Sequence, residues 1–173
     1  LGVKNVAHIL KQEGASNCLL VISAMGKMTN AFENIINASI NNDRDKLTES
    51  IDFTFNFHTK IISDLFQDAH KIHQKVTILF GEMIHFLAEN TSKEYDYLYD
   101  QIVCYGELLS TTIVSEYLND VGISNSWRDA RELVITDAVF RDASVNWVET
   151  EKRIKTEIDT SITTIVQGFI AGD

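Results

Sequence analysis

Proline is absent from this chain of 173 residues, whereas proteins on average contain about 5% proline. Its absence suits long uninterrupted helices, because proline removes a backbone donor and breaks a helix interior. Cysteine is scarce, and Cys18 and Cys104 form neither a Cys-x-x-Cys pair nor a disulfide framework, so a reducing cytoplasmic compartment is expected. No apolar run approaches the roughly 20 residues that a membrane-spanning helix needs.

Positively charged residues are also few compared with negatively charged ones. The chain has 15 Lys and Arg residues against 25 Asp and Glu residues, which gives a formal net charge of -10. This balance argues against a nucleic-acid-binding protein, which needs a basic surface, and against binding to an anionic membrane. Small ligands remain compatible with it, because a local site can be cationic on an acidic protein. The length fits one domain with a sizeable core.

The most informative stretch is the short apolar run of residues 18–22, which stops at Ser23. A small polar corner containing Gly26 follows, and a helical pattern begins after it. This order predicts a buried parallel strand over residues 18–23 that feeds a helix through a tight loop. Ligands of open α/β sheets bind at the carboxyl ends of strands and at the helix N-termini beyond them, so we expect one wall of an active site here.

Hydrophobic spacing predicts the other elements. Helices are expected over about 3–13, 32–40, 45–66, 72–86, 95–103, 106–121 and 147–158, and strands over 123–127 and 163–170. The alternation of Phe53, Phe55 and Phe57 is typical of a strand, but a longer helical stripe covers them and favours a helix. Thr91 and Glu94 resemble a capping box, and Gly106 is expected to start or kink the helix that follows. The order predicts an α/β domain with a largely parallel sheet.

Gly26 and Lys27 superficially match the end of a phosphate-binding P-loop. The glycine required five residues before this pair is replaced by Val21, and Met28 stands where Ser or Thr is needed, so we reject a P-loop. Ser23 and Thr29 instead flank a helix N-terminus, where free N–H groups and the helix dipole suit an anion. Plain capping of the helix by Thr29 is the favoured simpler interpretation.

Two further candidates carry ionisable side chains. His70 and His73 lie three residues apart near two aspartates, but a solvated helix face is favoured over a metal site, because no third ligand is dictated. Glu107 follows Gly106 at an expected helix start. It is either an ordinary first-turn acid or a carboxylate that holds a ligand's ammonium group. No nucleophile–base arrangement is recognisable, and we expect no metal ligands in this chain.

Four motifs, in order along almost the whole chain, resemble those of aspartokinases, members of the amino-acid-kinase family. Residues 21–30 resemble the substrate loop, and residues 105–110 resemble the Gly-Glu-Leu-x-Ser helix start. Residues 127–131, with Thr136, Asp137 and Phe140, resemble the Asp-x-Arg strand end and its loop. Residues 167–171 resemble the strand that closes the aspartate pocket. The long helical stretch before Glu107 resembles the subgroup with a large insertion, and residues 1–7 are similar to monofunctional members rather than to fusions with homoserine dehydrogenase.

The resemblance implies a three-layer α/β/α amino-acid-kinase fold and ATP- and Mg-dependent phosphorylation of the β-carboxylate of L-aspartate, the first step of lysine, threonine and methionine biosynthesis. It implies that Ser23 and Thr29 position aspartate, that Glu107 pairs with its ammonium group and that Phe169 shapes the pocket. Residues 1–173 then form the N-terminal, aspartate-binding part of the catalytic domain, with a helical insertion over about 45–105. The catalytic Lys-Phe-Gly-Gly and Gly-Arg-Gly-Gly-Ser-Asp loops, the nucleotide-binding half and the regulatory domains are expected outside it, and the full protein is expected to be a homo-oligomer.

Two alternatives stay open. A related kinase of the same fold could act on another carboxylate, such as N-acetylglutamate, which has no free ammonium group for Glu107. The aromatic-rich helical region over residues 45–103 could instead serve as a non-catalytic dimerisation or interaction module.

We predict that the isolated 173 residues have no kinase activity, because the lysine and arginine that handle phosphate in aspartokinases belong to motifs absent from this sequence. A coupled ATP-consumption assay on the purified chain measures this. Aspartate-dependent turnover by the chain alone would contradict the prediction.

Overall fold

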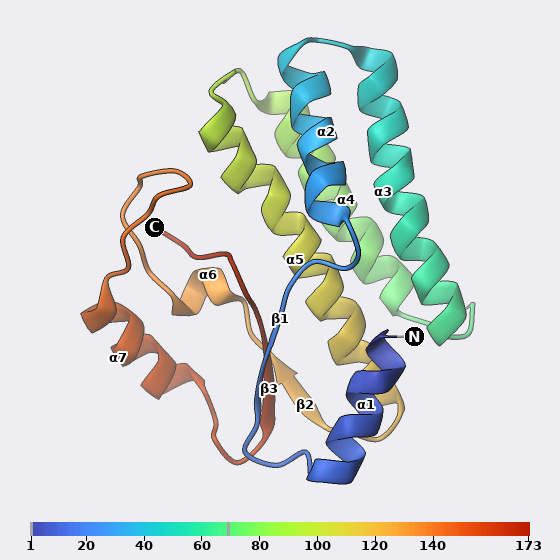
Figure 1. The fold of residues 1–173 in the computed structure, drawn as a ribbon, viewed down its shortest axis with the longest axis vertical. Coiled ribbons are helices and arrows are strands. Elements are labelled where there is room, and N and C mark those ends of the chain that lie inside the picture. The colour runs from blue at the N-terminus through green and yellow to red at the C-terminus, as the bar shows by residue number, and fades with distance from the viewer. Residues whose placement is uncertain (1, 69) are drawn as a thin grey trace.

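The computed structural model describes residues 2–68 and 70–173 of the chain. A bundle of long helices stands above a small sheet that is flanked by shorter helices (Figure 1). The elements are α1 Gly2–Glu13, β1 Leu19–Ile22, α2 Met28–Ile40, α3 Arg44–Leu65, α4 Ile72–Glu89, α5 Tyr95–Asp120, β2 Asn125–Trp127, α6 Ala130–Leu133, α7 Trp147–Glu157 and β3 Thr163–Gln167. In the described part of the chain, no helix is long and apolar enough to cross a bilayer.

Helices α2 to α5 form the larger hydrophobic core. Phe32 and Ile35 of α2, Ile62 of α3, Met83 of α4 and Ile102 of α5 are buried together there. Residues 53, 55 and 57 lie within α3, so the helical interpretation of this stretch is confirmed. Asp43 caps α3 by accepting a hydrogen bond from the backbone N–H of Lys46.

Helix α5 runs without interruption through Gly106, so the expectation that this glycine starts a helix is wrong. A Cβ on Gly106 would lie 3.2 Å from Cβ of Ala24 and 3.3 Å from the ring of Phe32, which shows that packing requires glycine here. The capping box is also wrong, because Glu94 stands at the N-cap position and its side chain makes no capping hydrogen bond. Thr91 therefore lies outside the helix.

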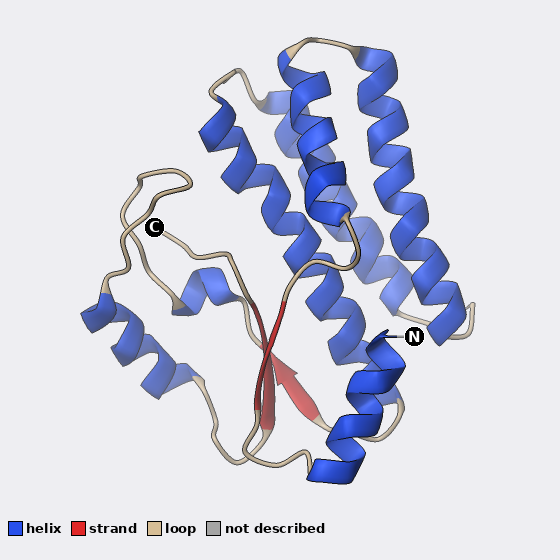
Figure 2. Cartoon of the chain, in the orientation of Figure 1, coloured by secondary structure: helices blue, strands red, loops and turns tan. Residues whose placement is uncertain are grey.

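The described sheet has three parallel strands, which confirms the predicted parallel sheet, and their order is β1-β3-β2 (Figure 2). Strand β3 is buried along its whole length, whereas β1 lies at the edge of the described sheet and alternates between exposed and half-buried residues. The expectation of a fully buried first strand is therefore wrong: Leu20 and Ile22 pack against the core formed with α1 and α5, and Leu19 and Val21 are exposed on the other side. Helix α6 is an additional element, too short for a periodic signal.

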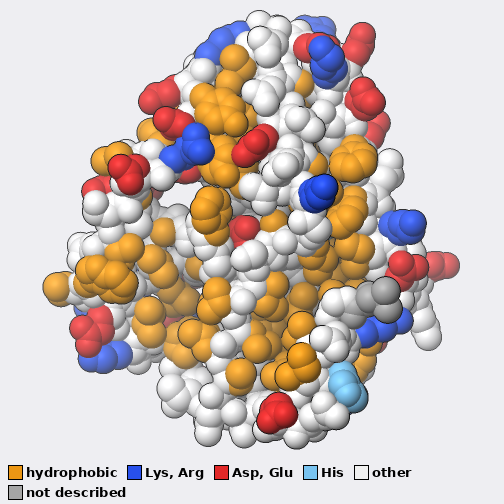
Figure 3. Space-filling view, in the orientation of Figure 1, with side chains coloured by type: hydrophobic (Ala, Val, Ile, Leu, Met, Phe, Trp, Pro, Cys, Tyr) orange, Lys and Arg blue, Asp and Glu red, His pale blue; other side chains and the backbone are white. Residues whose placement is uncertain are grey.

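Exposed apolar side chains lie on the part of the molecule that carries β1 and α7. Figure 3 shows hydrophobic side chains gathered in the lower centre and on the left of this face, where Figure 1 places these elements. Trp147 and Val148 begin α7 and are largely exposed, as Leu19 and Val21 are on β1.

A buried carboxylate joins α4 to α5. Glu116 of α5 lies 3.1 Å from the ammonium group of Lys71 and accepts a short hydrogen bond from Lys75. Burial raises the pKa of Glu116, but the hydrogen bonds and charges of the two lysines outweigh it and hold that pKa below its usual value. Because the folded-state pKa is lowered, the stabilisation is present above the unfolded-state pKa and is lost as the pH falls through the folded-state value.

We predict that Lys75→Met destabilises the chain by about 1–2 kcal/mol at pH 7, because the buried Glu116 loses a partner. The loss should shrink as the pH falls through the lowered folded-state pKa of Glu116, because protonation removes the charge that Lys75 partners. The matched control is Lys155→Met on α7, whose ion pair with Glu151 is exposed and screened by solvent and should therefore contribute little to stability. Urea unfolding at several pH values measures both variants, and equal losses would contradict the prediction.

Candidate substrate site

The candidate site lies where β1 and β3 end. The backbone N–H of Gly168, directly after β3, donates to the carbonyl of Ile22 at 3.1 Å. A Cβ on Gly168 would stand 3.3 Å from Oγ of Ser23 and from a methyl group of Val21. Glycine at position 168 therefore allows the two strand ends to approach each other, and it brings two sequence-predicted segments together.

Helix α5 is fastened to the same strand end. The hydroxyl of Ser110 donates a 2.8 Å hydrogen bond to the carbonyl of Ser23, across 87 positions of sequence. The close packing of Gly106 against Ala24 lies one turn earlier on α5. These two contacts fix the helix that carries Glu107 against the Ser23 corner.

Glu107 is buried, with only 3% of its surface exposed, and it lies in the interior of α5. The interpretation of Glu107 as an exposed first-turn acid is therefore wrong. Its Oε2 atom is shielded from solvent and has no hydrogen-bond partner among the described residues. Burial raises the pKa of Glu107 above its usual value, although a hydrogen bond from the backbone of Ala24 acts in the opposite direction. A buried carboxylate oxygen without a partner is suited to receive a cationic group.

Thr29 is the second residue of α2 and is half-buried. Lys27 stands at the N-cap, where no side-chain capping bond is made, so the interpretation of Thr29 as the N-cap is wrong. Ser23 is exposed at the other end of the corner. Their role in substrate binding stays a prediction.

Phe169 lies on the rim of a different hollow. Its backbone has a positive φ of 69°, and 73% of its surface is exposed. It lines a cavity of about 520 Å³, together with Cys104 and Arg131, that is distinct from the corner of Ser23, Thr29 and Glu107. Burial raises the pKa of the Cys104 thiol to about 11, so this thiol is protonated and is not a nucleophile at neutral pH.

The Asp-x-Arg motif is held in place by its own members and by β3. Nη2 of Arg131 donates to Asp129 at 2.6 Å, and the backbone N–H of Ala130 donates to the side chain of Gln167 at 2.7 Å. The amide group of Gln167 also donates to Thr111 on α5 at 2.8 Å. The roles of Gln167 and Ser110 as connectors were missed from the sequence, although both residues belong to the motifs singled out there.

The two histidines do not share a helix, which corrects the sequence interpretation. His70 precedes α4, stacks on Phe66 at a ring-centroid distance of 4.5 Å and accepts a hydrogen bond from the N–H of Ile72. His73 lies in the first turn of α4. Over residues 2–68 and 70–173, no three His, Cys, Asp or Glu side chains lie close enough together to hold a metal ion.

The chain has clear relatives. It is 27% identical to a bifunctional aspartokinase/homoserine dehydrogenase of Zea mays over 98% of its length, which is 19% of that protein. It is 30% identical to aspartokinase 1 of Arabidopsis thaliana over 76% of its length, which is 23% of that protein. The homologues of this chain are aspartokinases. The chain spans about a fifth of the length of these curated relatives, and no family model matches it.

The fold agrees with these relatives. The structure matches Escherichia coli aspartokinase III, solved in complex with lysine and aspartate, with a TM-score of 0.82 and 23% identity over 98% of this chain and 38% of that one. This match confirms the α/β fold of the aspartokinases for the chain. Both monofunctional and bifunctional aspartokinases are among the relatives, so the monofunctional assignment stays a prediction.

We predict that Glu107→Gln raises the melting temperature of the chain by a few degrees at pH 7 to 8. The folded-state pKa of Glu107 is raised, so ionisation of this buried carboxylate opposes folding above its usual pKa, and an uncharged amide removes that cost. The gain should vanish below about pH 4, where glutamate is protonated in both states. Thermal unfolding across this pH range measures it, and a lower melting temperature at pH 8 would contradict the prediction.

Proposed function

We propose that the protein carrying this chain transfers the terminal phosphoryl group of ATP to the β-carboxylate of L-aspartate, giving 4-phospho-L-aspartate. Residues 1–173 supply the acceptor side of that kinase. The observation that carries the proposal is Glu107, a buried carboxylate with a free oxygen beside the end of β1. The names of the relatives and the aspartate in the E. coli complex support the same substrate.

We assign to Glu107 the role of binding the ammonium group of aspartate. A cation brought beside its Oε2 atom would satisfy an oxygen that no described residue satisfies. Burial strengthens this interaction, because the effective dielectric constant is lower there than in water. N-acetylglutamate lacks the positive charge, so the environment of Glu107 favours an acceptor with a free amino group.

We assign to Ser23 and Thr29 the role of binding the carboxylate groups of the acceptor. They lie on either side of the Gly26 corner at the N-terminus of α2, where backbone N–H groups and the helix dipole favour negative charge. Phe169 is assigned to the wall of the pocket because it directly follows Gly168, which packs against Ser23, although its ring lines the neighbouring cavity beside Cys104 and Arg131.

The acceptor carboxylate is ionised at pH 7, since its pKa is near 4, so the reaction requires no general base. The residues of this chain contribute by orienting that carboxylate and by keeping the amino group fixed. ATP supplies the phosphoryl group, and E. coli aspartokinase III has been solved with aspartate and ADP. From the resemblance to aspartokinases, we assign ATP and Mg mainly to parts of the protein outside this chain.

The wider setting of the protein is part of the proposal. We retain a homo-oligomer, a role in lysine, threonine and methionine biosynthesis and a reducing, cytoplasmic location, which the two free cysteines permit. The plant relatives are named chloroplastic, so a plastid is the competing location. Helices α2 to α5 share a hydrophobic core and contact the corner of Ser23, which favours a catalytic part over a separate dimerisation module.

Glu107→Gln in the complete kinase tests the proposal. We expect the KM for aspartate to rise about tenfold to a hundredfold, because a charge-assisted hydrogen bond to the ammonium group is lost, while the KM for ATP stays within twofold. Glu82→Gln, an exposed site on α4, is the control and should change neither.

A substrate panel decides between acceptors. Wild-type turnover of N-acetylglutamate but not of aspartate would overturn the proposed substrate. An unchanged KM for aspartate in Glu107→Gln would overturn the role of Glu107 while leaving the substrate assignment intact.

A further inference from the structure

The corner between Ser23 and Thr29 touches a helix of the insertion. Gly26 sits in this corner with a positive φ of 59°. A Cβ at this position would lie 3.2 Å from Cζ and 3.6 Å from Cε2 of Phe57, which shows that the ring tip of Phe57 packs directly over the glycine. The sequence alone gave no sign of this contact, because the two residues are 31 positions apart.

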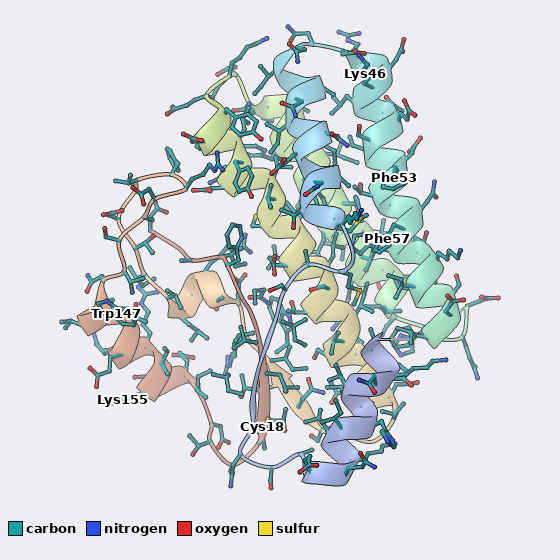
Figure 4. The ribbon with its side chains drawn as sticks, viewed as in Figure 1. Cys18, Lys46, Phe53, Phe57, Trp147 and Lys155 are labelled. Carbon is teal, nitrogen blue, oxygen red and sulfur yellow. The ribbon has the colours of Figure 1, made fainter. Side chains whose placement is uncertain are left out.

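Phe57 belongs to α3 and is half-buried. Figure 4 shows its side chain pointing from α3 toward the loop that leads into α2, whereas Phe53 lies further up the same helix. The ring of Phe57 is supported from behind by His58, with ring centroids 5.3 Å apart and nearly perpendicular planes. His58 is fully buried and is anchored by Nδ1, which lies 2.7 Å from the carbonyl of Thr54. Phe57 is thus held by a rigid part of the bundle core.

Other contacts also hold the corner: Met25 packs against both hydrophobic clusters, and its carbonyl accepts a 3.2 Å hydrogen bond from the backbone N–H of Met28. Ser23, Gly26 and Lys27 are exposed, and the N-cap position of α2 lacks a side-chain hydrogen bond. Ser110 fixes the strand end of the corner, through the carbonyl of Ser23. The ring of Phe57 is the side chain that packs against Gly26, midway between Ser23 and Thr29.

We propose that Phe57 is a positioning residue for the acceptor site. Its ring sets the path of the backbone at Gly26 and thereby the spacing of Ser23 and Thr29, without itself touching the substrate. This inference rests on the proposed function, and it gives the helical insertion a part in binding the acceptor. The insertion would then affect the affinity for the acceptor rather than the affinity for ATP.

Phe57→Ala in the complete kinase is the test. We expect the KM for aspartate to rise about tenfold, since small displacements of positioning groups carry large kinetic costs, with kcat and the KM for ATP within about twofold. Phe57→Met should restore most of the affinity, because an unbranched side chain can reach the same space. Phe53→Ala is the matched control: the same residue type, one helical turn away and 60% exposed, should leave all three constants unchanged.

Amide hydrogen exchange of the 173-residue chain gives a second measurement that needs no catalysis. Phe57→Ala should accelerate exchange in the peptide covering residues 23–29 at least fivefold, and Phe53→Ala should not. If the kinase uses an acceptor other than aspartate, the proposed function fails. The positioning role of Phe57 is still supported in that case if Phe57→Ala accelerates amide exchange over residues 23–29 and raises the KM for that acceptor. Unchanged exchange, an unchanged acceptor KM, or equal effects of the Phe53 and Phe57 substitutions would overturn it.

Discussion

The close passage of α5 across the end of β1 is the constraint on which the rest of the structure depends. Gly106 lets the helix approach Ala24 and Phe32, and Ser110 then bonds to the carbonyl of Ser23. Because the helix is held at these two points, the side chain between them, Glu107, is largely buried. Burial of Glu107 is thus a result of helix packing rather than of its own interactions.

Two glutamates on α5 show how the same helix serves stability and binding. Glu116 is neutralised by Lys71 and Lys75, and its pKa is lowered. Glu107 has no cationic partner among the described residues, and its pKa is raised. The first carboxylate joins two helices, whereas ionisation of the second opposes folding. A positive group beside Glu107, as we propose for the ammonium group of the acceptor, would remove that cost.

The local elements could be predicted from the sequence because each has its own pattern. Strand β1 is a continuous apolar run, and α3 carries a helical stripe that outweighs its alternating phenylalanines. Errors arose where tertiary packing overrides local preference. Gly106 was read as a helix start, although α5 keeps this glycine for its approach to Ala24. Thr29 was read as a cap, although α2 begins without a capping side chain.

The candidate site, like the fold, was predictable only where a local sequence pattern marks its residues. Local sequence motifs single out Ser23 and Glu107 as candidates. The contacts around them could not be predicted, because these contacts join residues far apart in the sequence: Ser110 with Ser23, and Phe57 with Gly26. Phe32 contacts Gly106 from α2, and Phe57 contacts Gly26 from α3, so the hydrophobic core of the bundle reaches the corner from two sides. Phe57 belongs to the expected insertion over about 45–105, whereas Phe32 precedes it, so both parts of the bundle contact this region. The bundle and the corner are therefore packed together.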